Sequence, residues 1–195
     1  MKIQDLEDID LEDIDREDLR NFYLSFQESL LYTDHKYLTL LKEHLSCDVR
    51  YLIKYEGSNI TLAMPYAVKD SEFGKIYNSL PYFGSNGGVI GSGASKELKL
   101  ELVNKFFSLA EEDSALSAVL ITNPLSEDDE FFMKNIECSY TDERIGQITS
   151  LPNVFDEDLL LSKFSNPRPR NIRKALKENV SVLKQNIEGI DFLYQ

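Results

Sequence analysis

The sequence predicts an α/β fold in which helices flank a mixed central sheet. Apolar residues recur at three- and four-residue steps in two stretches before residue 46, which is the pattern of amphipathic helices. β-Branched and aromatic residues dominate residues 49–55 and 60–68, and a continuous apolar run follows later at 115–122. Helices and strands are therefore both expected along one chain.

The first predicted helix covers residues 17–31. Its apolar stripe consists of Leu19, Phe22, Tyr23, Phe26 and Leu30. Asp34 is predicted to begin a second helix, because its short side chain can accept hydrogen bonds from free N–H groups of the first turn. The turn Gly-Ser-Asn at 57–59 joins two strands of a predicted hairpin, and residues 75–80 are predicted to form a third strand that ends before Pro81.

The following part of the sequence predicts a glycine-rich loop, two helices and two strands. Residues 83–93 are rich in glycine and lead into a helix that begins near Ser95. The apolar run at 115–122 has the pattern of a strand buried on both faces, so an interior place in the sheet is expected. A short helix is predicted from Ser126, and residues 140–150 alternate as a further strand.

The composition is that of an ordinary globular protein, with 42% hydrophobic and 28% charged residues. No apolar run approaches the roughly 20 residues that a membrane-spanning helix needs. The N-terminal MKIQDLEDID is the reverse of a secretory signal, so a cytoplasmic location is expected. The net charge of −13 argues against general DNA binding, because non-specific affinity for nucleic acid comes from Lys and Arg.

The cysteines and histidines predict no metal site. Cys47 and Cys138 lie far from one another and from any His at ligand spacing. His35 and His44 are nine residues apart, too far for a pair of metal ligands on one side of a helix. Buried or half-buried thiols in a reducing compartment and surface or capping histidines are the expected roles.

Charge is distributed unevenly along the chain. Nine of the 34 acidic residues fall in the first 18, where the pentad LEDID occurs at 6–10 and again at 11–15. This predicts a solvated acidic arm over residues 1–16, for which binding of a basic partner is the alternative role. Residues 17–165 are then the main domain. Six of the 21 basic residues occur between 163 and 177 without an intervening acid.

Two stretches of the sequence, together with the order of the predicted elements, point to a known family. Residues 74–88, GKIYNSLPYFGSNGG, resemble the strand, SLP, aromatic residue and G-x-x-GG of FemAB-type acyltransferases. Residues 166–182, NPRPRNIRKALKENVSV, resemble the basic helix R-x-x-I-R-K-A of that family, its turn and its V-x-V. Tyr32-Thr33-Asp34 is similar to its early aromatic-Thr helix start. The element order itself resembles that of the GNAT acetyltransferase fold.

The resemblance implies half of an N-acyltransferase. Such an enzyme moves an acyl or aminoacyl group from a CoA or tRNA donor to an amine acceptor in cell-envelope or surface-polymer biosynthesis. It also implies a second GNAT-like half as partner. Residues 166–195 are expected to hold the basic helix and the truncated start of that half, with a strand at 180–185 and an unfinished helix at 190–195. The alternative is a non-catalytic GNAT-fold domain that binds a ligand or another protein.

The glycine-rich loop is the first candidate site. Backbone N–H groups of such a loop and the dipole of the following helix favour phosphate, and in GNAT enzymes this loop carries the pyrophosphate of the cofactor. The GNAT pattern is Gln or Arg, two residues, Gly, any residue, then Gly or Ala. Gly91 and Gly93 match it, whereas Gly88 stands in place of Gln or Arg. A loop that only shapes a cleft is the alternative, and no tightly bound cofactor is expected.

Substrate contacts are expected at the end of the third strand, where open α/β sheets leave a ligand crevice. The residues expected to make them are Tyr82, Asn86, Gly87 and Gly88. Hydrophobic packing is the alternative role of this segment.

The basic helix is the second candidate site. Arg170, Arg173, Lys174 and Lys177 share one helical face. Arg forks and Lys charges suit the phosphates of CoA, aminoacyl-tRNA or a phosphorylated small molecule, and a solvated face is the alternative. No catalytic residue is assigned. In this kind of transfer the amine attacks the acyl group directly, so the protein has to position the reactants and transfer protons but does not need a nucleophile of its own.

Overall fold

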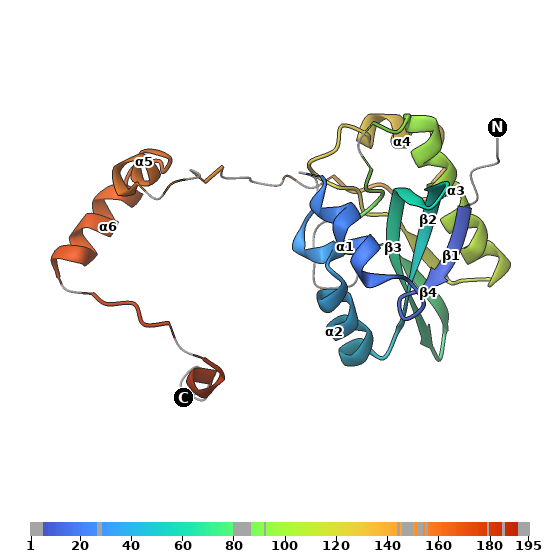
Figure 1. Ribbon diagram of the computed structural model, residues 1–195, viewed down its shortest axis with the longest axis horizontal. Coiled ribbons are helices and arrows are strands. Elements are labelled where there is room, and N and C mark those ends of the chain that lie inside the picture. The colour runs from blue at the N-terminus through green and yellow to red at the C-terminus, as the bar shows by residue number, and fades with distance from the viewer. Residues whose placement is uncertain are drawn as a thin grey trace. The chain divides into compact units, whose positions relative to one another are not determined.

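The computed structural model describes residues 6–26, 29–79, 87–91, 93–143, 145, 150–151, 154, 156–178, 180–184 and 186–190. The chain divides into two compact units, Met1–Asp142 and Glu143–Gln195, whereas the sequence suggested a boundary after residue 165. Within the described part of the first unit, five strands form one sheet in the order β1-β2-β3-β4-β5 (Figure 1). The pairings up to β4 are antiparallel and β4 pairs with β5 in parallel, so the predicted mixed sheet is confirmed.

The two LEDID pentads adopt different structures, and the prediction of a loose acidic arm is wrong for residues 6–16. The first pentad is strand β1, Leu6–Asp10, which pairs with β2. Asp8 accepts a hydrogen bond from Arg50 Nε at 2.9 Å, so this acidic strand is bound by a cation on its neighbour. The second pentad buries Leu11 and Ile14 in the core and ends at Asp15, which caps the next helix.

Helices α1, Arg16–Leu24, and α2, His35–Leu45, cover one face of the sheet, with the 3-10 turn η1, Leu31–Thr33, before α2. Asp34 caps α2 as predicted, accepting from Lys36 N at 2.9 Å. The first helix is shorter than predicted. It ends where the Ser25 hydroxyl donates to Phe22 O at 2.6 Å, which satisfies a carbonyl that continued helix would have used.

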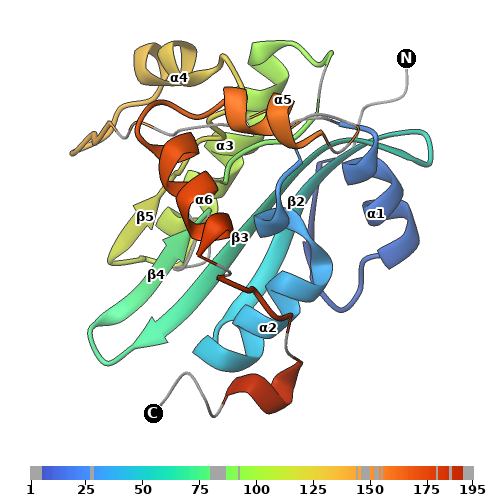
Figure 2. The ribbon, with the colours of Figure 1, turned by 90° about the vertical axis from the view of Figure 1, so that its left-hand side faces the viewer.

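Strands β2, Asp48–Glu56, and β3, Asn59–Ser71, form the long predicted hairpin at the centre of the sheet (Figure 2). Their side chains alternate between two cores. Tyr51 and Ala67 pack under α1 and α2, whereas Leu52 and Tyr66 pack under helix α3, Lys96–Glu112. Figure 1 shows α1 and α2 on one face of the sheet and α3 on the other, as the two cores require.

Strands β4, Gly74–Asn78, and β5, Ser117–Val119, end the described sheet. The expectation of an interior strand buried on both faces over 115–122 is wrong: β5 has three residues, is partly exposed, and has a described neighbour only in β4. Helix α4, Asp129–Asn135, follows. The described residues within 140–150 form no strand, because alternation along one segment yields a strand only where a partner pairs with it.

The second unit contains helices α5, Glu157–Ser162, and α6, Arg168–Lys177, and the 3-10 turn η2, Ile187–Gly189. The predicted strand at 180–185 is absent from the described residues 180–184. Leu161 is the buried hydrophobic residue of the described part of this unit. Large apolar side chains such as Leu176, Val182 and Ile187 are instead exposed. No helix among the described residues is long and apolar enough to cross a membrane.

Candidate functional site

The candidate site lies at the C-terminal ends of the parallel strands β4 and β5, which are at the same edge of the sheet. Ser79, which follows β4, is fully buried and continues the pairing, because its N–H donates to Val119 O at 3.0 Å. Its hydroxyl accepts from Ile121 N at 2.8 Å and donates to Ile121 O at 3.3 Å. The serine side chain therefore joins the two strands one step beyond the regular ladder.

The glycine-rich loop re-enters the sheet at Ile90, beside β3. Ile90 N donates to Ala63 O at 2.9 Å, and Ala63 N donates to Ile90 O at 3.0 Å. Gly91 follows with a φ of +148°, and a Cβ there would collide with the Leu62 side chain and lie 2.5 Å from Thr61 O. Only glycine fits this position, so the first matching glycine of the loop is required by its close approach to β3.

Gly88 packs against the segment that continues β5. It has a φ of +82°, and a Cβ there would lie 3.1 Å from Ile121 O and 3.3 Å from Thr122 Cα. These neighbours are backbone atoms, which cannot move aside as a flexible side chain does. The same local geometry explains why this position holds Gly in place of Gln or Arg, since either side chain would be strained and crowded.

Helix α3 begins directly after this loop and presents its positive end. Ser95 is the N-cap, and its hydroxyl accepts from Leu98 N at 3.4 Å. Glu97 occupies the first turn, where its own backbone N–H and then the Ser95 hydroxyl hold the pKa of its carboxyl below the usual value. The helix dipole favours an anion here. The Glu97 carboxylate already occupies this end of the helix, and its negative charge would repel a bound phosphate.

A buried ion pair fixes the first turn of α3. Lys99 Nζ donates to Asp128 Oδ2 at 2.6 Å, and the two side chains are only 8% and 6% exposed. Lys96 Nζ donates to Glu127 O at 2.7 Å on the same side. Asp128 is also the N-cap of α4 but makes no capping hydrogen bond with its side chain, because that carboxylate is turned to Lys99.

The structure places the predicted substrate residues only in part. Gly87 and Gly88 are buried, and Gly88 lies against the segment that follows β5, whereas Tyr82 and Asn86 lie outside the described residues. The sequence reasoning missed Ser79 and the pair Lys99 and Asp128. Ser79 belongs to the quoted SLP signature, so that motif held a signal for it, but the charged pair is 29 residues apart and no local pattern joins it.

The basic residues of α6 lie on one helix of the second unit, as predicted. Arg173 is 3.8 Å from Asp158 and Lys174 is 3.7 Å from Glu178, in pairs that are at least half exposed on both sides. The interaction energy of such exposed ion pairs is small, so these basic side chains stay accessible to a ligand. Among the described residues, Arg170 and Lys177 have no ion pair, so the face keeps most of its positive charge available.

Known proteins resemble the chain in fold and not in sequence. A scan against family models gives no match, and a search of curated proteins gives none. The ribosomal-protein-alanine N-acetyltransferase from Brucella melitensis biovar Abortus 2308 matches with a TM-score of 0.50 at 14% identity, over 74% of this chain and 99% of that chain. The glucosamine-6-phosphate N-acetyltransferase from Arabidopsis thaliana gives a TM-score of 0.42 at 10% identity, over 76% of this chain and 100% of that chain. The first of these matches shows the GNAT-like fold.

Proposed function

We propose that the chain is half of a FemAB-like N-acyltransferase acting in cell-envelope or surface-polymer biosynthesis. The observation that carries the proposal is the loop around Gly91. On a GNAT-like sheet, this loop leaves β3 by a turn that only glycine permits and opens directly onto the N-terminus of α3. A donor with phosphate groups, either acyl-CoA or aminoacyl-tRNA, is the ligand class that this arrangement suits.

The proposed reaction is direct transfer. The nitrogen of the acceptor amine forms a bond to the acyl carbon, and the carbon–sulfur bond of a thioester or the carbon–oxygen bond of an aminoacyl ester breaks. The leaving thiol or hydroxyl takes up a proton equivalent to the one that the amine releases. Because the protein contributes no covalent step, its task is to hold donor and acceptor in line and to exclude water. No general base is assigned.

A second GNAT-like half would complete the cleft. Support comes from the second unit, in which Leu176, Val182 and Ile187 are 55%, 93% and 80% exposed. Exposed large apolar side chains of this kind would be covered if another domain packed against this unit. The basic face of α6 would then hold donor phosphates with Arg170, Arg173, Lys174 and Lys177. The cytoplasm, where such donors are made, is the proposed location.

A non-catalytic GNAT-fold domain is the second candidate, and two observations favour it. Gly88 is fixed as glycine by the backbone of Ile121 and Thr122, so the loop lacks the Gln or Arg of the GNAT pattern. The Glu97 carboxylate already sits at the positive end of α3. Both features would weaken CoA binding relative to a GNAT enzyme. They therefore favour a domain that binds a ligand or another protein without catalysis.

Donor binding tests the proposal. Calorimetric titration with CoA and with aminoacyl-tRNA, at several salt concentrations, should show binding that weakens as salt rises. Arg170→Ala/Arg173→Ala should reduce the affinity and flatten the salt dependence. A matched control, Arg20→Ala/Lys134→Ala, removes the same number of exposed cations from the first unit and should change neither. Equal effects of the two double variants, or binding of neither donor, would contradict the proposal.

A further inference from the structure

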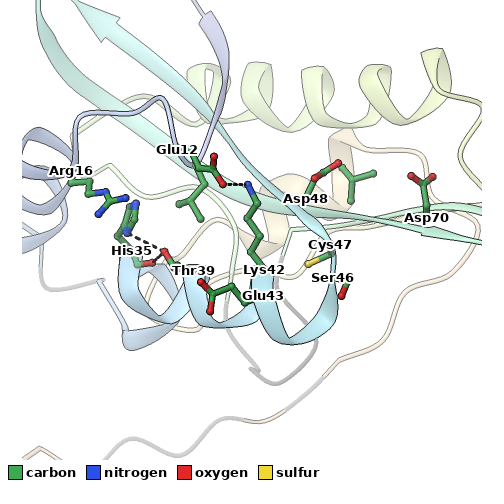
Figure 3. A pocket seen from close by; sticks show the side chains of 12 residues that line it. Glu12, Arg16, His35, Thr39, Lys42, Glu43, Ser46, Cys47, Asp48 and Asp70 are labelled. Atoms are coloured by element: carbon green, nitrogen blue, oxygen red, sulfur yellow. Dashed lines mark hydrogen bonds and ion pairs between the residues drawn. The ribbon is translucent and has the colours of Figure 1, made fainter.

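A groove of about 810 Å³ lies in the first unit, at the opposite end of the sheet from the glycine loop. Its polar and charged lining includes Arg16, His35, Lys42, Glu43, Asp48 and Asp70 (Figure 3). Asp70 is seven residues along β3 from Ala63, which pairs with the loop, and that separation is about 23 Å in a strand. The groove is therefore distinct from the proposed acyl-transfer site, and its volume is typical of small-molecule sites.

One end of the groove carries positive charge that the protein does not neutralise. Arg16 is the first residue of α1, where the helix dipole disfavours a cation. Among the described residues, no carboxylate lies within 4.0 Å of its guanidinium. Figure 3 shows Arg16 next to His35, the first residue of α2.

His35 adds a polar atom that lacks a partner. The Thr39 hydroxyl donates its single hydrogen to His35 O at 2.8 Å and lies 3.2 Å from Nδ1, so Nδ1 carries the hydrogen that joins ring and hydroxyl. Nε2 is buried and has no hydrogen-bond partner among the described residues. Burial of an unpaired polar atom is costly. With the ring hydrogen on Nδ1, Nε2 is an acceptor, and an N–H group of a ligand would satisfy it.

The other end of the groove is negative. Glu43, Asp48 and Asp70 form no ion pair within the part of the chain that the structure describes. In the middle, Lys42 is held by Glu12 at 2.7 Å and by Asp10 at 3.5 Å, so it offers little free charge. Figure 3 shows Arg16 and His35 on one side of the pocket and Asp48 and Asp70 on the other.

We propose that this groove binds a short basic peptide with a free C-terminal carboxylate. The carboxylate lies at Arg16, an N–H group of the peptide donates to His35 Nε2, and the ammonium groups lie at Asp48 and Asp70. A ligand with more ammonium groups than carboxylates is required, because Glu12, Glu43, Asp48 and Asp70 outnumber the cations Arg16 and Lys42 in the lining. The volume accommodates a dipeptide or tripeptide and is too small for a folded partner.

The test uses the dipeptide Lys-Lys, with a free C-terminus and as its C-terminal amide, titrated calorimetrically into the 195-residue chain at low ionic strength. The free dipeptide should bind about tenfold more tightly than the amide, which is the effect of one charge-assisted contact. Arg16→Gln should remove that difference, and Asp70→Asn should weaken both ligands by about tenfold.

Glu72→Gln is the matched control, because Glu72 is exposed in the turn after β3, close to Asp70 in sequence, and does not line the groove. It should leave both affinities unchanged. Equal binding of the free and amidated dipeptides, or no binding at millimolar concentration, would overturn the proposal. So would an effect of Glu72→Gln as large as that of Asp70→Asn, which would show general attraction to an acidic surface only. None of these results depends on acyl-donor binding.

Discussion

Removal of the Asp128 carboxylate should lower the free energy of unfolding of the first unit more than a substitution at an exposed position does. The reason is that it leaves Lys99 charged and buried without its partner. Lys99 and Asp128 side chains are 8% and 6% exposed, with Nζ and Oδ2 2.6 Å apart. Breaking a buried pair by removal of one partner costs roughly 3–5 kcal/mol. The lower end, about 3 kcal/mol, applies to Asp128→Ala, since the Lys99 stem can partly redirect its charge to water. No helix cap is lost with it, because the Asp128 side chain makes none.

Urea unfolding followed by far-UV circular dichroism measures this change. The double variant Asp128→Ala/Lys99→Met should recover most of the lost stability, because it buries no unpaired charge. The matched control is Glu130→Gln, which breaks an exposed pair with Lys134 whose side chains are 90% and 74% exposed, and it should change stability by less than about 0.5 kcal/mol. A loss below about 1 kcal/mol for Asp128→Ala, or no recovery in the double variant, would refute the reasoning.

Two further changes test the sheet and its edges. Gly91→Ala should lower the free energy of unfolding in urea by about 2–4 kcal/mol, because a disfavoured φ is combined with a collision against β3. Gly57→Ala, at a φ of +66° with open space around it, should lower it by about 1–2 kcal/mol. Equal losses in the two variants would contradict the geometry. The hydrogen bond from Lys75 Nζ, and then that from the Tyr77 hydroxyl, hold the pKa of Asp113 below its usual value. That contribution to stability is therefore complete above the unfolded-state pKa and is lost as pH falls through the lowered pKa. NMR titration should find a depressed midpoint for Asp113 that Lys75→Met raises, and a midpoint at the ordinary aspartate value would contradict this.

Local sequence patterns predicted the elements whose partners lie close along the chain. The Asp34 cap and the hairpin around residues 57–59 depend on neighbouring residues, and both are found. The two LEDID pentads could not be told apart by pattern, because their difference lies in partners. The first faces Arg50 across the sheet and the second buries Leu11 and Ile14. Their negative charge suggested solvation, but strand pairing of the first pentad and apolar burial in the second place both in the folded unit.

The position of β5 and the candidate site depended on contacts that no local pattern contains. The run at 115–122 is apolar enough for burial on both faces, yet in the described residues a strand lies on one side only. The departure at Gly88 was visible in the sequence, whereas its cause, the backbone of Ile121 and Thr122, was not. The basic face of α6 follows directly from helical spacing, and its role as a phosphate site stays a prediction.

Acyl-transfer turnover with and without a second GNAT-like half tests the central claim most directly. The 195-residue chain is assayed with acetyl-CoA and aminoacyl-tRNA donors against amine acceptors, beside a polypeptide in which a second half follows it. Well-held reactants reach effective molarities on the order of 10⁵ M or more, so loss of half the cleft should cost many orders of magnitude. The half-enzyme account predicts turnover only in the longer polypeptide. Robust turnover by the 195-residue chain alone, or none in either form, would contradict it.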